Sequence, residues 1–280
     1  MTVAVLTDSA ASLPKELATE HGVTIVPMWL TIGGTPVHDG DLSLEEVMAR
    51  VDEGVTTSGP TPGEFAAKLE EALGAPGVDG AVIVTIASTM SGTTQAALVA
   101  QQLHGSERVR VVDSCTAAGA EGLVVTAAAR VASAGGDIDE VEAAARHAAT
   151  RVHLVATVAN LDRLAKSGRV PEAAAWAGRW LGLQPLFEFR DGGAHPLRPS
   201  RSRAAALDRI FERCRSSRPD GVCRVSALHA LSEEPAHDLL ARVRGALDPG
   251  ESWVGSFSPV MVAHTGPHLV GLAWWWDDTS

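Results

Sequence analysis

The chain has 280 residues and a formal net charge of −11, with 45% hydrophobic and 20% charged residues. This length favours two domains over one, and the composition predicts a chain that folds by itself around a hydrophobic core of useful size. Because the net charge is negative and the arginines are scattered, nucleic acid is excluded as an expected partner.

In the N-terminal half, short apolar segments alternate with longer segments that have helical spacing. Two of the predicted helices begin with a capping box, in which the N-cap residue precedes a glutamate by three positions: Thr61 with Glu64, and Asp137 with Glu140. The alternation predicts a parallel sheet with helices on both faces, which is a three-layer α/β domain. Strands are predicted at residues 3–6, 23–32, 81–86 and 109–112, a loop at 57–60, and helices from residue 12, at 42–51, from 61, at 92–103, at 116–132 and at 137–150.

After residue 152 the pattern changes to strands separated by variable helices and by hairpin turns, such as the turn at residues 191–193. We therefore predict an N-terminal α/β domain over residues 1–152 and a C-terminal α+β domain over residues 153–280. The last apolar run, at 269–276, is far shorter than the ~20 residues of a membrane helix, so it predicts a buried strand and no membrane span. The other C-terminal strands are predicted at residues 152–156, 186–189, 224–229 and 253–256.

Several hydroxyl side chains stand where a strand ends or a helix begins, among them Thr57, Ser58 and Ser91. Ser91, Gly92 and Thr93 come between a predicted strand and a predicted helix. Unpaired N–H groups and hydroxyls at such a place can hold a carboxylate or phosphate oxygen. Each hydroxyl taken alone is also compatible with an ordinary helix cap.

One histidine and two arginines are further candidates for binding an acid. His264, in a turn between two apolar segments, can donate a hydrogen bond to an acid head group or can be purely structural. Arg201 and Arg203 precede an apolar helix, and a guanidinium suits a carboxylate because it donates two parallel hydrogen bonds. A solvated helix start is the alternative interpretation for at least one of them.

Metal and nucleotide chemistry are not expected from this sequence. The histidines lack the spacing of a metal cluster, the three cysteines form no CxxC pair, and no GxxxxGK[ST] loop is present. The odd cysteine count fits a reducing compartment, and the first residues lack the basic and apolar regions of a signal peptide. A cytoplasmic location is therefore predicted.

Seven short motifs mark the chain: TDS at residues 7–9, DG at 39–40, TSGPTPGEF at 57–65, SGT at 91–93, VDS at 112–114, LAKSGRV at 164–170 and HTGP at 264–267. Each motif is weak alone, but their order and spacing together are specific. In this arrangement the chain resembles, nearly from end to end, the DegV family of bacterial fatty-acid-binding proteins, which includes the binding subunits of fatty acid kinase.

The resemblance implies a parallel α/β domain joined to an α+β domain. It also implies a long-chain fatty acid as the bound ligand, buried between or within the domains, and no cofactor. The residues implied to hold the carboxylate are Thr57 or Ser58, Ser91, the backbone near Gly92, His264 and a nearby arginine, which Arg201 matches better than Arg203.

By the same resemblance, the chain presents the carboxylate to a partner, an ATP-dependent fatty acid kinase, which phosphorylates it to an acyl-phosphate. The chain is then not an enzyme by itself, and it makes at most transient contact with a membrane. Two alternatives stay open. One is a stand-alone lipid carrier or sensor, and the other is an esterase or thioesterase with Ser9 or Ser91 as the nucleophile and His264 as the base, although no GxSxG motif is present.

Overall fold

The computed structural model describes residues 2–159, 161–170, 173–180, 182–217 and 220–278. Its strands are β1 (Thr2–Asp8), β2 (Val23–Val26), β3 (Trp29–Ile32), β4 (Thr35–His38), β5 (Val55–Ser58), β6 (Val78–Thr85), β7 (Val109–Asp113), β8 (His153–Thr157), β9 (Gln184–Arg190), β10 (Gly193–Ser200), β11 (Val222–His229), β12 (Glu251–Ser256) and β13 (Val270–Asp277). Its helices are η1 (Ser9–Ala11), α1 (Lys15–Glu20), α2 (Leu44–Ala49), η2 (Val51–Glu53), α3 (Pro62–Leu73), α4 (Thr93–His104), α5 (Ala118–Ser133), α6 (Ile138–Ala149), α7 (Asp162–Ser167), α8 (Ala173–Arg179), α9 (Arg203–Ser216), α10 (Glu233–Leu247) and α11 (Pro259–Thr265).

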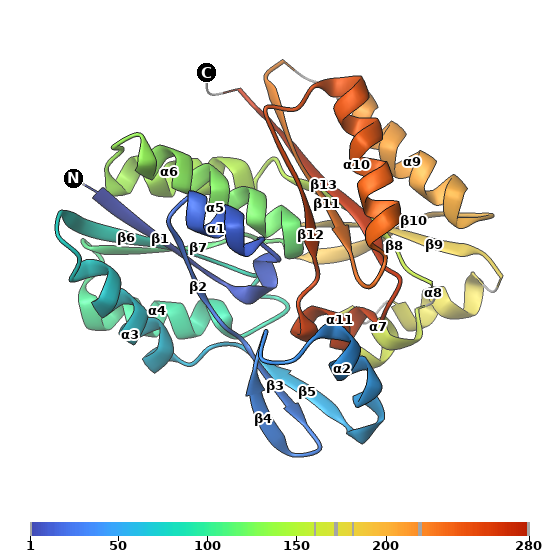
Figure 1. Cartoon of the computed structure of the whole chain (residues 1–280), viewed down its shortest axis with the longest axis horizontal. Coiled ribbons are helices and arrows are strands. Elements are labelled where there is room, and N and C mark those ends of the chain that lie inside the picture. Colours follow the sequence, from blue (N-terminus) through green and yellow to red (C-terminus); the bar gives the residue numbers. More distant parts are fainter. Residues whose placement is uncertain (1, 160, 171–172, 181, 218–219, 279–280) are drawn as a thin grey trace.

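The N-terminal half is built on a four-stranded parallel sheet in the order β2-β1-β6-β7. Helices α3 and α4 pack against one face of this sheet, and α5 and α6 pack against the other (Figure 1). The predicted three-layer α/β arrangement is therefore confirmed. Both predicted capping boxes are present, with Thr61 and Glu64 at the start of α3 and Asp137 and Glu140 at the start of α6.

The C-terminal half is a six-stranded mixed sheet in the order β10-β9-β8-β13-β11-β12. Helices α9 and α10 cover one face of it, and α5 contacts the other face at β11 and β13. The predicted hairpin is present between β9 and β10, where Asp191 and Gly192 both have positive φ angles. The C-terminal half is thus of mixed α and β structure, as predicted.

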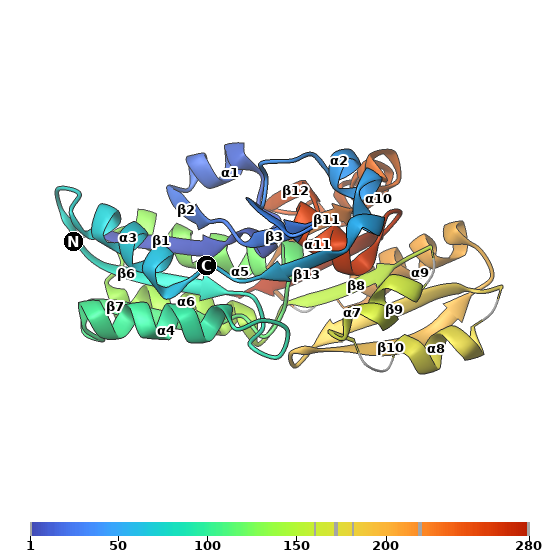
Figure 2. The ribbon, with the colours of Figure 1, turned by 90° about the horizontal axis from the view of Figure 1, so that it is seen from below.

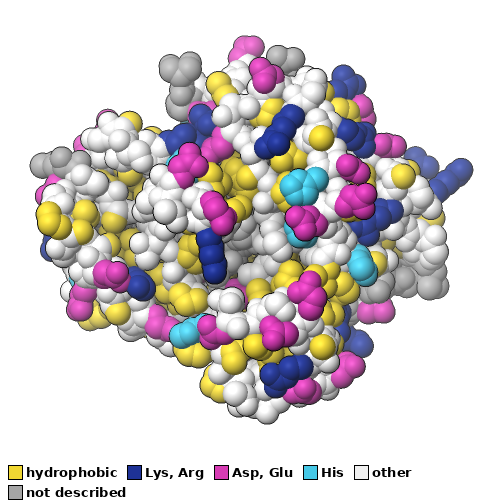
Figure 3. Space-filling model, in the orientation of Figure 1, with side chains coloured by type: hydrophobic (Ala, Val, Ile, Leu, Met, Phe, Trp, Pro, Cys, Tyr) yellow, Lys and Arg dark blue, Asp and Glu magenta, His cyan; other side chains and the backbone are white. Residues whose placement is uncertain are grey.

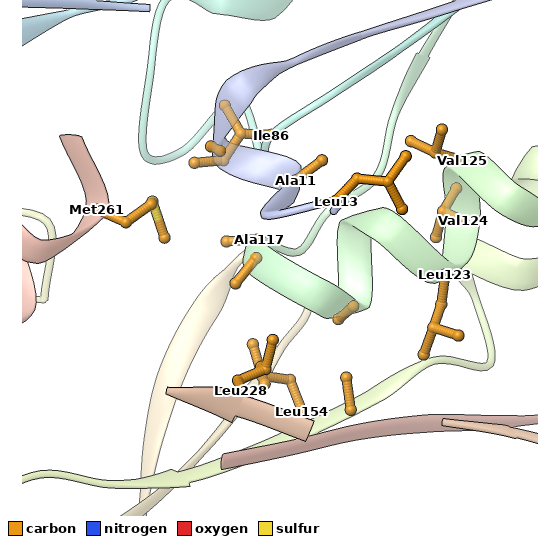
Figure 4. Packing of buried hydrophobic residues seen from close by; sticks show 14 of the residues in the cluster. Ala11, Leu13, Ile86, Ala117, Leu123, Val124, Val125, Leu154, Leu228 and Met261 are labelled. Atoms are coloured by element: carbon orange, nitrogen blue, oxygen red, sulfur yellow. The ribbon is translucent and has the colours of Figure 1, made fainter. Parts of the chain in front are cut away.

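Helix α5 lies between the two large sheets and belongs to the core of both. The largest hydrophobic cluster joins residues of β1, α5, β8 and β13, and Figure 4 shows Leu154 and Leu228 pointing from their strands toward α5. Gly119 allows this close approach, because a β-carbon at that position would lie 2.8 Å from the Ser226 Cβ of β11. All strands of the parallel sheet precede residue 152, and all strands of the mixed sheet follow it. The boundary at residue 152 stays a prediction, since one core spans it.

A third, three-stranded antiparallel sheet, β4-β3-β5, differs from the sequence-based expectation. The segment 23–32 was expected to be one extended piece, but it divides into β2 of the parallel sheet and β3 of the small sheet. Pro27 stands between them and has no N–H to continue a ladder. Residues 57 and 58, expected in a loop, belong to β5 because they pair with β3. The small sheet lies beside α2, α7 and α11 (Figures 1 and 2).

The start of the first helix also differs from the expectation. Ser12, expected to cap it, instead adopts a left-handed conformation after η1, with φ 50°. Helix α1 begins at Lys15, directly after Pro14, without a side-chain cap.

Figure 3 shows how charged side chains are distributed on one face of the molecule. Basic and acidic side chains are mixed there and do not form a continuous basic track. Within the residues that the structure describes, no helix is both long enough and apolar enough to cross a bilayer.

Two buried carboxyl groups meet where β1 passes α5. Burial raises the pKa of Glu121 well above its usual range, and the neighbouring Asp8 charge adds to this effect. Burial also raises the pKa of Asp8 to about 6, although the N–H groups of Ala10 and Ile86 each donate to it at 2.9 Å. Because burial and the repulsion between the two carboxylates both disfavour a second negative charge, the folded protein favours the protonated form of Glu121.

We expect Glu121→Gln to raise the free energy of unfolding at pH 7.5 by about 2 kcal/mol and to change it little near pH 4.5. The folded chain keeps the Glu121 proton at pH values where the unfolded chain releases it. The stability of the native protein therefore falls as pH rises, and Gln removes this loss. Urea titrations at both pH values measure the difference, with the exposed Glu70→Gln as the control. An equal effect at both pH values would contradict the raised pKa of Glu121.

Candidate ligand-binding site

A cavity of about 380 Å³ lies between the end of β5, the loop after β6, and helices α7 and α11. Its volume is within the ~300–1,000 Å³ typical of small-molecule sites. Five of the six predicted site residues line it, although they come from distant parts of the sequence: Thr57, Ser58, Ser91, Gly92 and His264.

The first polar pair in the cavity joins β5 to α11. Thr57 Oγ1 and His264 Nε2 are 2.7 Å apart, across 207 residues of sequence. Burial, together with the Arg169 cation, lowers the pKa of His264 to about 4. The imidazole is therefore neutral at pH 7, with one ring nitrogen as donor and the other as acceptor.

The second polar pair lies at the start of α4. Ser91 Oγ and Thr93 Oγ1 are 2.8 Å apart, and Thr93 is fully buried. Gly92 occupies the N-cap and offers no side-chain cap, and the N–H of Thr93, the first residue of α4, donates to Ser91 Oγ at 3.4 Å. The sequence indicated Ser91 and Gly92 as ligand contacts, but it did not indicate Thr93 as the partner of Ser91.

The rest of the cavity wall is largely apolar. Three of the five methionines of the chain, Met28, Met90 and Met261, line it. Methionine side chains are flexible and fill irregular space, so this wall can adapt to an apolar chain. The other apolar lining residues are Pro60, Ile86, Leu164 and Val260. The cavity lining thus combines hydrogen-bonding groups with a largely hydrophobic wall.

Of the three arginines considered at this site, Arg201, Arg203 and Arg169, the cavity is lined only by Arg169. Arg201 is exposed before α9 and does not line the cavity, so its role stays a prediction. Arg203 donates from Nη1 to the His268 carbonyl at 3.2 Å and lines a separate surface pocket. Arg169 lines the cavity instead. It belongs to the LAKSGRV motif, which was visible in the sequence but carried no assigned role.

Among the described residues, no three His, Cys, Asp or Glu side chains are grouped so that they could hold a metal ion. Three other motif residues, Asp8, Ser9 and Asp39, lie outside this cavity lining and line a separate pocket. Ser9 donates to Asp39 at 2.5 Å. These residues are structural neighbours of the site.

Comparison with known proteins matches both the sequence and the fold. The family model described as "Uncharacterised protein, DegV family" covers residues 2–276. A DegV domain-containing protein of Mycobacterium tuberculosis is 34% identical over 275 residues, which is 97% of this chain and 96% of that protein. Another, from Streptomyces coelicolor, is 34% identical over 278 residues, covering 96% of this chain and 97% of that protein.

Two solved structures are similar over essentially their whole length. A fatty-acid-binding DegV family protein from Thermus thermophilus has a TM-score of 0.92 at 28% identity, covering 99% of this chain and 100% of that one. DegV of Bacillus subtilis, a fatty acid binding protein, has a TM-score of 0.85 at 25% identity, covering 99% and 100%. Since the family model, the relatives and the fold agree from one end of the sequence to the other, the chain belongs to the DegV family.

Proposed function

We propose that this protein binds a long-chain fatty acid in the cavity between β5, α4, α7 and α11. The observation that carries the proposal is that two hydroxyls, Thr57 and Ser91, line a largely apolar cavity and that each is hydrogen-bonded to a second polar group. The structural neighbours from Thermus thermophilus and Bacillus subtilis are described as fatty acid binding, which supports the same ligand class here.

The two polar pairs can satisfy a carboxylate in a definite order of hydrogen bonds. If His264 Nε2–H donates to Thr57 Oγ1, the Thr57 hydroxyl is free to donate to one carboxylate oxygen. In the same way, the Thr93 hydroxyl can donate to Ser91 Oγ and leave the Ser91 hydroxyl for the other oxygen. A carboxylate removed from water needs such donors, because its desolvation is costly.

The apolar wall supplies the affinity. At ~0.8 kcal/mol for each buried CH₂ group, a chain of roughly 16 carbons gains about 10 kcal/mol before ordering costs. We expect organic extracts of the purified protein to contain one fatty acid per chain, identified by mass spectrometry, and His264→Ala to retain less. Repeatedly empty extracts, together with no uptake of added fatty acid, would contradict the proposal.

We further propose that the protein acts in the cytoplasm and presents the carboxylate to an ATP-dependent fatty acid kinase. Three lining residues, Ser58, Gly92 and Arg169, are exposed, and this supports the proposal because a partner protein could reach the cavity from the surface. Acyl-phosphate should form when the loaded protein, ATP and a kinase recovered from the host are combined. Robust acyl-phosphate formation by this chain alone would refute the proposal that a separate kinase phosphorylates the fatty acid.

Two other functions remain as alternatives to be tested. A stand-alone carrier or sensor would bind the same fatty acid, and a pull-down from the host that recovers no kinase would favour it. The esterase hypothesis has less support, because no hydrogen bond among the described residues joins Ser9 or Ser91 to His264. Hydrolysis of an acyl ester that is lost in Ser91→Ala would revive it.

A further inference from the structure

Asp39, directly after β4, joins the N-terminal half of the chain to α11. Only 9% of its surface is exposed. Its Oδ1 accepts a hydrogen bond from the Val260 N–H at 3.0 Å, across 221 residues of sequence. Its Oδ2 accepts from the Ser9 hydroxyl at 2.5 Å, and its own N–H donates to the Met28 carbonyl at 2.8 Å. The Ser9 hydroxyl therefore fixes one carboxylate oxygen of Asp39, and the other oxygen is hydrogen-bonded to the first turn of α11.

Helix α11 depends on this outside acceptor. Ser258 occupies its N-cap, but the Ser258 side chain makes no capping hydrogen bond. Pro259, the first residue of the helix, has no N–H to donate. The first available donor is the Val260 N–H, and Asp39 accepts it. Because N–H groups of a first turn have no partner within the helix, an acceptor from elsewhere determines where the helix begins and how it is held.

The same helix carries part of the cavity. Val260 and His264 are four residues apart, so they lie on one face of α11, and both line the cavity. The network also reaches a second part of the lining, because Ser9 Oγ accepts the N–H of Met28 at 3.1 Å and Met28 is a lining residue. Asp39 thus connects two walls of the cavity without lining it.

We propose that Asp39 is a positioning residue for the carboxylate-binding site, which keeps His264 Nε2 within hydrogen-bonding distance of Thr57 Oγ1 by holding the start of α11. The identity of the ligand rests on the proposed function. The position of His264 does not, since it can be measured in the protein without ligand.

The test compares two substitutions at this position. Asp39→Ala removes the acceptor of the Val260 N–H, and we expect it to weaken fatty acid binding about tenfold. Asp39→Asn keeps an acceptor oxygen at the same place, and we expect binding within about threefold of the native protein. Fluorescence titration with a fatty acid probe measures both.

The second readout is the NMR titration of His264 in the ligand-free protein, with His264→Gln used to assign the signal. His264 has a pKa of about 4 because it is buried and near Arg169. If α11 is released, water reaches the imidazole, and we expect its pKa to rise toward the usual value in Asp39→Ala but not in Asp39→Asn. A residue that only stabilised the fold would lower the melting temperature and leave this titration unchanged.

Asp41→Ala is the matched control. Asp41 lies in the same loop and accepts the His38 N–H at 2.9 Å, whereas the Val260 N–H of α11 donates to Asp39. We expect it to change neither readout. If Asp39→Ala does not fold, Ser9→Ala removes the bond to Oδ2 and the acceptor of the Met28 N–H but leaves the Val260 N–H bonded to Oδ1, and we expect an intermediate loss of affinity.

The outcomes separate this proposal from the proposed function. Unchanged affinity and an unchanged His264 titration in folded Asp39→Ala would overturn the positioning role. A native protein that binds no fatty acid, while the His264 pKa still rises in Asp39→Ala, would support the positioning role and overturn only the assignment of the ligand.

Discussion

Removing both cavity hydroxyls, in a Thr57→Val and Ser91→Ala double variant, should weaken fatty acid binding about a hundredfold. Each hydroxyl is proposed to donate to a carboxylate oxygen, and a hydrogen bond to a charged group contributes roughly 1.5–3 kcal/mol. Two such bonds together correspond to at least about two orders of magnitude in Kd. Isothermal titration calorimetry with a fatty acid measures the change.

Two controls make this experiment specific. Thr56 and Ser88 are exposed residues of the same types that stand close in sequence to the two cavity hydroxyls but do not line the cavity. A Thr56→Val and Ser88→Ala double variant should therefore bind the fatty acid normally. A fatty acid methyl ester carries no charge, so its affinity should differ much less between the native protein and the Thr57 and Ser91 double variant. If the double variant binds the acid as tightly as the native protein, the head-group site is wrong.

Replacing Gly119 by alanine should lower the free energy of unfolding by about 3 kcal/mol or more. A β-carbon there would overlap the side chains of Ser226 and Leu228 on β11, which are fully buried. Because α5 packs between two sheets, it cannot move away from β11 without disturbing β1. Adding a methyl group to a close-packed core typically lowers the free energy of unfolding by about 1–3 kcal/mol. Where the neighbouring backbone cannot shift, we expect a loss at the upper end of this range or above it. Urea denaturation followed by circular dichroism measures the loss.

Gly245→Ala is the matched control for this prediction. Gly245 lies in the exposed part of α10, and a β-carbon there would meet no atom within 4 Å. Alanine has a higher helix propensity than glycine, so this variant should be more stable by ~0.5–1 kcal/mol. Equal effects of the two substitutions would mean that α5 does not need a glycine to approach β11.

Local sequence signals predicted much of the fold because they act over a few residues. The capping box at Thr61 and Glu64 and the alternation of apolar strands with helices are of this kind, and both are confirmed. Pro27, which separates β2 from β3, was also visible in the sequence, but the apolar residues on both sides of it favoured a single extended segment over residues 23–32. The small sheet was missed because its strands are short and pair across a loop.

The candidate site was only partly predictable, since its geometry depends on contacts between distant segments. The pattern indicated Thr57, Ser91 and His264 one by one, yet no local signal reports that Thr57 and His264 meet. The hydrogen bond from Val260 to Asp39 is of the same kind. No role was assigned to Arg169 from the sequence, because a single arginine in a motif does not indicate whether its side chain faces a cavity or the solvent.

The shared helix α5 restricts how a long acyl chain can reach the interior. If the two halves swung apart as rigid bodies, each 100 Å² of apolar surface exposed along α5 would cost about 2.5 kcal/mol, so we expect this motion to be too rare for loading. Helices α7 and α11 are short, with six and seven residues, and both contribute residues to the cavity lining. We therefore expect the acyl chain to pass through transient displacement of these two helices. Substitutions that stiffen them would slow both uptake and release while leaving equilibrium affinity nearly unchanged.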